Sequence, residues 1–305
     1  MVERLPSKQH TRVRFPSPAL FGRMTPTFLL KLSRPGLWFS TIWVYLLPTS
    51  RMPEVWGSLP FWVGLAYVSF PLNFLIYGWN DISDYEIDQI NNVRKDNFWF
   101  GARATRAQLD ALPPYLVASQ VPFAIALVWI AGWTAGLFLL GLVVSTALYN
   151  FPKRPWSGRA PLELLNQFGF LVLLPLSMQI NHTPPVSAAA MIYLALFWLH
   201  SHMIGEVLDM EPDRQAGRKT TALLIGMSAS KWLIIVTVLI EALLLFFYFR
   251  DWYLGAFLIA ADVLVFFVDR TYSKRDFTLI GIGMNLSGFA SMAWVWETGT
   301  LMPPS

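Results

Sequence analysis

The sequence predicts an all-α protein that crosses a membrane many times. Of its 305 residues, 55% are hydrophobic and only 14% are charged, and the mean hydropathy is +0.46. This composition lies outside the range of soluble globular proteins. Apolar runs long enough to cross a bilayer as helices recur along the chain, and the charged residues gather between them. Together these observations favour a polytopic membrane fold over a soluble one.

We expect about nine transmembrane helices, because nine apolar runs are separated by polar segments or tight turns. Gly132 separates the third run from the fourth, and His182, Thr183 and Pro184 stand between the fifth and the sixth. Short connections of this kind favour helices packed side by side in a bundle. The expected spans are residues 26–49, 57–80, 113–131, 133–149, 162–181, 185–205, 230–249, 252–269 and 277–298.

The basic residues indicate how these helices are oriented. With nine spans and the N-terminus inside, 21 of the 23 lysine and arginine residues fall on one side, and only Arg51 and Arg250 fall on the other. Because cytoplasmic loops are enriched in basic residues, we expect the N-terminus and both acidic segments described below to be cytoplasmic. The pI near 9.3 then reflects topology, and no nucleic-acid partner is expected.

Residues 1–23 are expected to be a basic, disordered tail, followed by a single transmembrane domain over residues 24–305. The tail is basic, contains proline and lacks the apolar stretch of a signal peptide. Its peptide Val13–Pro16 back-translates to GTTCGATTCCC, the consensus of a tRNA T-arm. We therefore expect the assigned start to run into a neighbouring tRNA gene, with Met24 as the true initiator. A native N-terminal peptide containing Val13 would contradict this expectation.

Polar and acidic side chains gather at the end of the second apolar run. If the helix continues there, Asn80, Asp84 and Asp88 lie at i, i+4 and i+8 on one face. Asp81 lies about one turn from Asp84. Carboxylates at a membrane boundary are costly unless they hold a cation or another partner. For one such cluster alone, a solvated helix end would be the ordinary interpretation.

A second acidic cluster follows the sixth run, at the same expected depth. Asp209 and Asp213 stand four residues apart, and Arg214, Arg218 and Lys219 follow them. Mg²⁺ takes oxygen ligands and bridges phosphate oxygens, and basic side chains bind the oxygens that the metal leaves exposed. The absence of cysteine excludes disulfides and thiolate metal sites. Two clusters of this kind predict a Mg²⁺–diphosphate site.

Other polar residues near the clusters have two interpretations. Arg34 is flanked by apolar sequence, so it either snorkels to the interface or lines a polar cavity, and we favour the cavity. Tyr149, Lys153 and Arg154 close the fourth run on the same side, where diphosphate binding competes with ordinary interfacial positioning.

Two histidines and one glutamate precede the second cluster. We expect His200 and His202 to make helix–helix hydrogen bonds, which is the commoner role of a histidine in a membrane. Glu206 lies three residues before Asp209, on roughly the same face, and a position at the edge of the cluster is its expected role.

The two acidic motifs resemble those of the UbiA superfamily of intramembrane prenyltransferases. That family has an N-D-x-x-D-x-x-x-D motif after its second helix and a D-x-x-x-D motif after its sixth. The resemblance extends over about residues 28–298 and includes Leu32–Pro35 at the start of the first span. Its matching residues are Asn80, Asp81, Asp84 and Asp88 in the first motif, Asp209 and Asp213 in the second, and Arg214, Arg218 and Lys219 after it.

The resemblance implies nine helices around a central cavity, capped by cytoplasmic motif loops. It also implies Mg²⁺-dependent transfer of a prenyl group from a prenyl diphosphate to a lipophilic acceptor, among membrane lipids. The implied metal ligands are Asn80, Asp84, Asp88, Asp209 and Asp213. The implied catalytic residues are Asp81, Asp84, Asp209 and Lys219, and the implied substrate-binding residues are Arg34, Asn80, Arg94, Lys95, Tyr149, Lys153, Arg154 and Arg218.

The sequence leaves the acceptor and two other functions open. The run Ile76–Glu86 looks closest to the carotenoid-elongating branch, whereas Lys153 and Arg154 favour an aromatic acceptor. A terpene cyclase of the same superfamily would ionise the donor and close its chain without an acceptor. A transporter would use the acidic residues as a cation pathway, but acidic clusters at one membrane face with basic neighbours disfavour that function.

Overall fold

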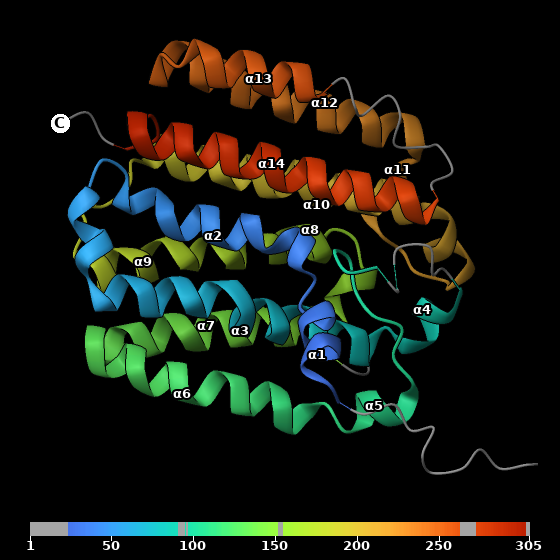
Figure 1. The fold of residues 1–305 in the computed structure, drawn as a ribbon. Helices are drawn as coiled ribbons and strands as arrows, with labels where there is room; N and C mark the ends of the chain where they lie inside the picture. The colour runs from blue at the N-terminus through green and yellow to red at the C-terminus, as the bar shows by residue number, and fades with distance from the viewer. Residues whose placement is uncertain (1–23, 91–94, 96, 152–154, 263–272, 303–305) are drawn as a thin grey trace, which may run out of the picture.

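A bundle of long helices makes up the described part of the chain. The computed structural model describes residues 24–90, 95, 97–151, 155–262 and 273–302. Within these ranges, six helices are long and apolar enough to cross a membrane, and two shorter apolar helices accompany them. They run side by side along one direction (Figure 1). The predicted all-α, multi-pass membrane fold is confirmed, while the tail over residues 1–23 lies outside the described residues.

Each of the nine predicted spans contains helix within the described residues. In chain order the helices are α1 (Pro26–Leu32), α2 (Trp38–Leu46), α3 (Leu59–Ser83), α4 (Tyr85–Ile90), α5 (Arg106–Asp110), α6 (Pro113–Ala131), α7 (Trp133–Tyr149), α8 (Leu162–Gln167), α9 (Leu173–Asn181), α10 (Ala188–Gln215), α11 (Thr221–Ile225), α12 (Met227–Leu243), α13 (Trp252–Asp262) and α14 (Lys274–Thr298).

Several spans are interrupted in ways that the apolar pattern does not reveal. The first span is divided into α1 and α2 by a break at Ser33 and Arg34. The fifth is divided into α8 and α9 by the 3-10 segment Phe168–Val172, and α12 continues into the π-helical segment Leu244–Phe249. Apolar residues flank the first interruption and continue through the other two, so hydropathy predicts one long helix where the backbone changes its path.

Both acidic motifs lie on helical backbone that extends beyond the predicted ends of the spans. Helix α3 continues to Ser83, and α10 continues to Gln215. At the junction of α3 and α4, Asp84 N donates to Asn80 O and Asp88 N donates to Asp84 O, each at 2.8 Å. These i to i+4 bonds keep the first motif on nearly one helix face, as the spacing predicts.

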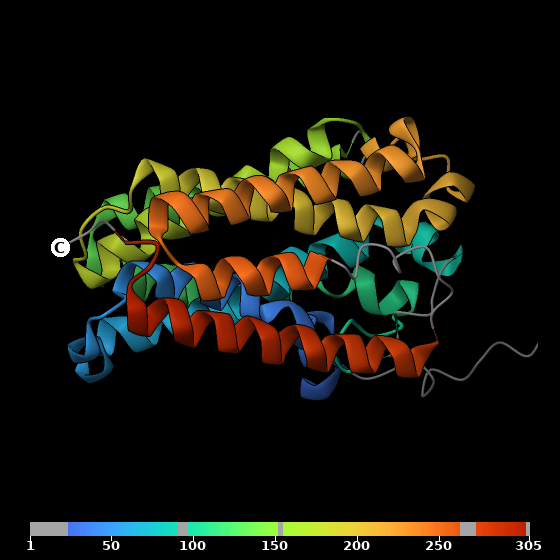
Figure 2. The ribbon, with the colours of Figure 1, turned by 90° about the horizontal axis from the view of Figure 1, so that it is seen from above.

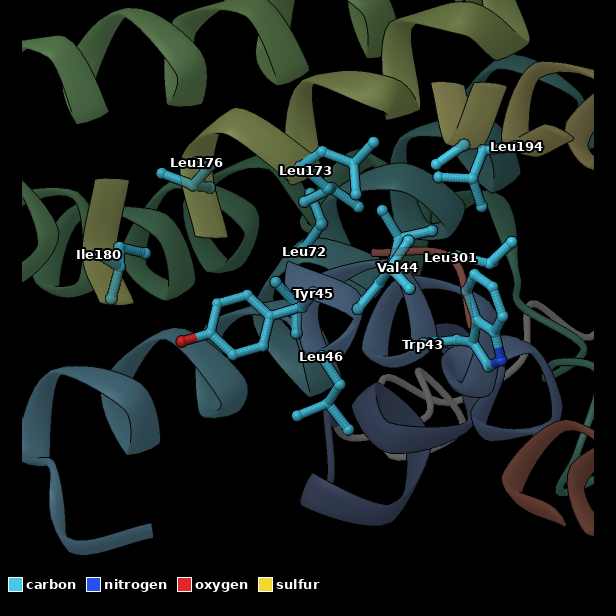
Figure 3. Close-up of a cluster of buried hydrophobic side chains, with 14 of the residues drawn as sticks. Trp43, Val44, Tyr45, Leu46, Leu72, Leu173, Leu176, Ile180, Leu194 and Leu301 are labelled. Atoms are coloured by element: carbon cyan, nitrogen blue, oxygen red, sulfur yellow. The ribbon is translucent and has the colours of Figure 1, made fainter. Parts of the chain in front are cut away.

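The main apolar core joins α2, α3, α9 and α10 (Figure 3). Tyr45, Leu72, Leu173 and Leu176 belong to this core, and all four side chains are fully buried. Helices in lipid gain little from apolar burial as such, so close packing and paired polar groups hold them together. The backbone oxygen of Tyr45 accepts from Ser177 Oγ at 2.5 Å, and its hydroxyl donates to Phe61 O at 2.9 Å.

One end of the bundle collects the segments that carry the polar motifs. Helix α3 ends there, α4 and α5 lie there, and α10 also ends there (right side of Figure 1). We call this end the motif end. Seen from above, α10 and α12 lie side by side along the bundle (Figure 2), and these two helices pack against each other. The fold therefore brings two motifs that are more than a hundred residues apart to one end of the molecule.

Candidate active site

Arg34 enters the motif end from the break in the first span. Its backbone is left-handed, with φ 51° and ψ 71°, immediately before the 3-10 turn Pro35–Leu37. Gly36 N donates to Trp99 O at 2.8 Å, and Asn285 Nδ2 donates to Gly36 O at 3.0 Å. A Cβ atom at Gly36 would lie 2.7 Å from Trp99 O, so glycine is required for this close approach. The turn thus fixes the strained backbone from which the Arg34 side chain extends.

Two cations hold Asp81 in a buried position. Arg34 Nη2 lies 2.6 Å from Asp81 Oδ1, and Lys95 Nζ lies 2.5 Å from the same oxygen. Lys95 Nζ also lies 2.6 Å from Asp88 Oδ2. The other oxygen of Asp81 is buried and accepts no hydrogen bond from the described residues. This carboxylate therefore has a lone-pair oxygen available at the centre of the first motif.

Arg218 connects the two acidic motifs. Its Nη2 lies 2.5 Å from Asp84 Oδ1, and its Nη1 lies 3.5 Å from Asp213 Oδ1. Asn80 Nδ2 donates to Asp84 Oδ2 at 3.0 Å and to Asn150 Oδ1 at 3.2 Å. Carboxylates from α10 and from the end of α3 thus converge on one guanidinium group, and the two motifs form a single site.

A small hollow opens beside the first motif. Asp81, Asp88, Lys95 and Arg103 are among the residues that line it. Burial raises the pKa of the Asp88 carboxyl to about 6, although Lys95 acts in the opposite direction. A raised pKa marks a carboxylate whose negative charge is incompletely compensated, so a bound cation would stabilise its ionised form.

The donor set fits Mg²⁺ by its chemistry. The predicted ligands supply carboxylate and amide oxygens, which Mg²⁺ prefers, and Asp81 adds a buried oxygen that accepts no hydrogen bond from the part of the chain that the structure describes. Among the described residues, no three histidine or acidic side chains already stand at metal-binding spacing. Instead, Arg34, Lys95 and Arg218 lie against the carboxylates. The site therefore has the correct ligands, here paired with basic side chains.

The remaining predicted residues occupy different positions around this site. Asp209 is half-buried on α10, one turn before Asp213. The Lys219 side chain is exposed, but two hydrogen bonds hold its backbone. Lys219 N donates to Gly158 O at 3.1 Å, and Lys219 O accepts from Ala160 N at 2.8 Å. Arg94, Lys153 and Arg154 lie outside the described residues, and their predicted roles stay predictions.

Asn150 and Arg103 are site residues that the sequence analysis did not select. Asn150 is 1% exposed, and its backbone oxygen accepts from Ser83 Oγ at 2.9 Å. Asn150 directly follows the predicted site residue Tyr149, and this adjacency is the one feature of the sequence that could have indicated its role. Arg103 was counted only as one of the basic residues between the predicted spans. In the structure it lines the hollow beside the first motif.

The fold and the site define a multi-pass membrane protein with a carboxylate- and arginine-lined site at one end of its helical bundle. The chain belongs to the UbiA prenyltransferase family, whose profile matches residues 37–289. This confirms the resemblance in the motifs. The chain is thus an integral membrane enzyme of prenyltransferase type, and family membership gives the transporter alternative no support.

Curated relatives include two proteins named lycopene elongase/hydratase. The one from Corynebacterium glutamicum is 30% identical over 224 residues, which are 71% of this chain and 75% of that protein. The one from Haloferax volcanii is 28% identical over 248 residues, which are 78% of this chain and 77% of that protein.

Solved structures of a UbiA homolog from Archaeoglobus fulgidus have the same fold. The structure bound to DMAPP and Mg²⁺ gives a TM-score of 0.60 at 16% identity, over 87% of this chain and 99% of that one. The structure bound to GPP and Mg²⁺ gives 0.59 at 15% identity, with the same coverage. At this level of identity, the likeness shows the fold alone.

Proposed function

We propose that the protein transfers a prenyl group from a prenyl diphosphate, with Mg²⁺, to the end of an acyclic isoprenoid polyene such as lycopene. The observation that carries this proposal is the convergence of both acidic motifs on Arg218 at the motif end. The identity of the acceptor rests on the relatives, which are named lycopene elongase/hydratase. Their names favour the isoprenoid acceptor over the aromatic one.

The ion pairs of the site suit a metal-bound diphosphate. Arg34, Lys95 and Arg218 each contact a carboxylate that Mg²⁺ would also bind. If Mg²⁺ were bound by the carboxylates, these basic side chains would be available to bind the diphosphate oxygens. The Archaeoglobus fulgidus homolog, which has this fold, was solved with DMAPP and Mg²⁺ bound.

The charges of the site favour ionisation of the donor. The bond between C1 and the bridging oxygen breaks, and its electron pair leaves with the diphosphate. Arg34, Lys95 and Arg218 stabilise the negative charge that develops there, because fixed donors in a water-poor site cost little reorganisation. Mg²⁺, when bound, adds Lewis-acid stabilisation of the same oxygens.

Aromatic side chains lie next to these cations, where the allylic cation would form. The Arg34 guanidinium carbon lies 4.8 Å from the centre of the Tyr77 ring, and Tyr149 lies near Arg218. Apolar and aromatic walls exclude water, which would otherwise capture the cation as an alcohol. The terminal double bond of the acceptor then supplies the electron pair for the new bond to C1.

Purified protein in lipid nanodiscs tests this function directly. The protein is supplied with Mg²⁺, DMAPP or GPP, and either lycopene or a hydroxylated aromatic acid, and products are identified by mass spectrometry. With DMAPP, we expect lycopene to gain C5H8, with or without one water. EDTA should abolish the reaction and excess Mg²⁺ should restore it. A prenylated aromatic product alone would contradict the proposed acceptor, and a cyclic terpene formed without acceptor would indicate the cyclase.

A further inference from the structure

His202 and Glu206 form a polar pair below the second acidic motif. His202 Nε2 lies 3.3 Å from Glu206 Oε1, and their side chains are 19% and 5% exposed. His202 precedes Asp209 by seven residues on α10, which is about two turns, so it lies on nearly the same helix face and about 10 Å further from the motif end. The imidazole therefore stands in the bundle interior, in the layer beneath the proposed metal site.

Tyr149 joins this pair to the diphosphate site. Its ring meets the His202 ring edge to face, with centroids 6.1 Å apart and an angle of 81°. The same tyrosine interacts electrostatically with Arg218, Asp84 and Glu206. One side chain thus borders both the proposed leaving-group site and His202. A donor whose diphosphate lies at Arg218 would extend its C1 atom and prenyl chain toward this layer.

His200 differs from His202 in having its partner on another helix. His200 Nδ1 lies 2.6 Å from Glu241 Oε1 of α12, and both side chains are buried. This is the helix–helix contact that the sequence analysis expected of a membrane histidine. Within the described residues, the ionic partner of His202 is Glu206 on its own helix, so this contact does not tie α10 to a neighbour. His202 contacts another helix through its ring, which packs edge to face on Tyr149 of α7.

The proposed reaction releases a proton in this layer. When the π electrons of the acceptor form the new bond to C1, the neighbouring carbon of the acceptor becomes a tertiary cation. A neutral product needs the loss of one proton. Either a C–H electron pair beside the cation closes to a new double bond as that proton leaves, or a water molecule adds its lone pair to the cation and then gives up a proton. The names elongase and hydratase correspond to these two outcomes in the relatives.

We infer that His202 is the base that accepts this proton, an inference that rests on the proposed function. A ring nitrogen of His202 takes the proton, and the Glu206 carboxylate, whose Oε1 lies 3.3 Å from Nε2, stabilises the imidazolium that results. Glu206 itself is less suited as the base, because its Oε2 accepts from Ala222 N at 2.9 Å and joins α11 to α10.

Two substitutions of His202 test this inference: glutamine keeps a side chain that can form hydrogen bonds, and alanine removes it. His202→Gln and His202→Ala are assayed in nanodiscs with DMAPP, Mg²⁺ and lycopene, and prenylated lycopene and inorganic diphosphate are measured separately. Both variants should lower prenylated lycopene by about a hundredfold or more, the usual contribution of a general base. The KM for DMAPP should stay within about twofold, because His202 does not hold the diphosphate. Diphosphate release should fall less than prenylation, with the difference appearing as prenyl alcohol.

His200→Gln is the matched control, because it changes a histidine two residues away that faces α12. It should keep the wild-type ratio of prenylated lycopene to released diphosphate. Wild-type prenylation by His202→Gln, with or without loss in His202→Ala, would show a structural role and overturn the inference. A rise in the KM for DMAPP that accounts for the whole loss would also overturn it. If wild-type protein prenylates no lycopene, the proposed function fails and the inference fails with it.

Discussion

Arg218 contacts both acidic motifs, and its shape matters as much as its charge. Its two terminal nitrogens lie 2.5 Å from Asp84 and 3.5 Å from Asp213. A lysine presents one point charge and cannot span two carboxylates in this way. We expect Arg218→Lys to lower kcat/KM for the prenyl diphosphate by about tenfold or more, as for loss of one charged hydrogen bond. Arg214→Lys is the control, since Arg214 forms an exposed pair with Glu211, and equal losses in both would contradict this assignment.

Carboxylates of the proposed metal site should be needed for turnover and dispensable for folding. Asp84→Ala and Asp209→Ala should each leave less than about a tenth of the wild-type rate, because each removes a ligand oxygen from the leaving-group side of the reaction. Size-exclusion profiles of the purified variants should match that of the wild type. Asp110→Ala removes an exposed carboxylate paired with Arg106 and should remain active. Activity above a tenth in either site variant would remove that residue from the metal site.

Substitutions of Lys219 test whether the diphosphate site extends into the loop between α10 and α11. Its side chain is exposed, while its backbone is tied to Gly158 and Ala160. As a diphosphate ligand, Lys219→Ala should raise the KM for the donor, lower kcat, or both, with little change in the acceptor KM. Lys219→Arg should retain part of the activity, because charge dominates at a mobile phosphate contact. Unchanged donor kinetics in Lys219→Ala would leave Lys219 as a basic loop residue without a chemical role.

At the residue scale, spacing predicts which side chains share a helix face but not which distant side chains meet them. The i, i+4 and i+8 pattern placed the first motif on one face, as the backbone hydrogen bonds at Asp84 and Asp88 show. The contact of Arg34 with Asp81 joins residues 47 positions apart, and that of Asn80 with Asn150 joins residues 70 positions apart. Such pairings depend on tertiary packing, which a single sequence does not encode locally.

At the element scale, the break before α2 is the feature that positions a cation in the site. Gly36→Ala would place a methyl group 2.7 Å from Trp99 O, so the turn and the Arg34 side chain should shift. We expect a loss of stability of about 1–3 kcal/mol, as for an overpacked position, together with lower activity. Thermal unfolding in detergent and the transfer assay measure the two effects. Gly57→Ala is the control, because a Cβ atom there meets nothing within 4 Å, and it should behave like the wild type.

Helices were more predictable than their interruptions. Helix lies within each of the nine predicted apolar runs, and six helices of the described residues are long and apolar enough to span, because the bilayer requires long apolar segments whose backbone groups are satisfied within a helix. Hydropathy did not locate the break at Arg34, which apolar residues flank, or the one at Phe168–Val172, where apolar sequence continues. Such breaks need local partners instead, as in the hydrogen bond from Gly36 to Trp99 that stabilises the first one.

At the scale of the whole molecule, both motifs follow apolar runs of even number and so meet at one end of the bundle. The helices of the first and ninth runs also begin at this end: α1 enters from it, and α14 runs from it to the opposite end (Figure 1). In the proposed function, the charged diphosphate enters at this end of the bundle and the prenyl chain extends among the apolar helices. From the basic residues of the flanking loops we expect the motif end to face the cytoplasm, by the positive-inside rule.

Reporter fusions test this orientation. A reporter fused after Ser305 should lie on the extracytoplasmic side, because nine spans that begin inside end outside. A reporter inserted between Phe98 and Ala107 should stay cytoplasmic, since that segment lies at the motif end. An insertion after Asn181, at the turn between α9 and α10, serves as a second extracytoplasmic control. Cytoplasmic signals from both Ser305 and the 98–107 segment would mean an even number of crossings. That result would contradict the topology argument, and with it the proposal that the diphosphate enters from the cytoplasm.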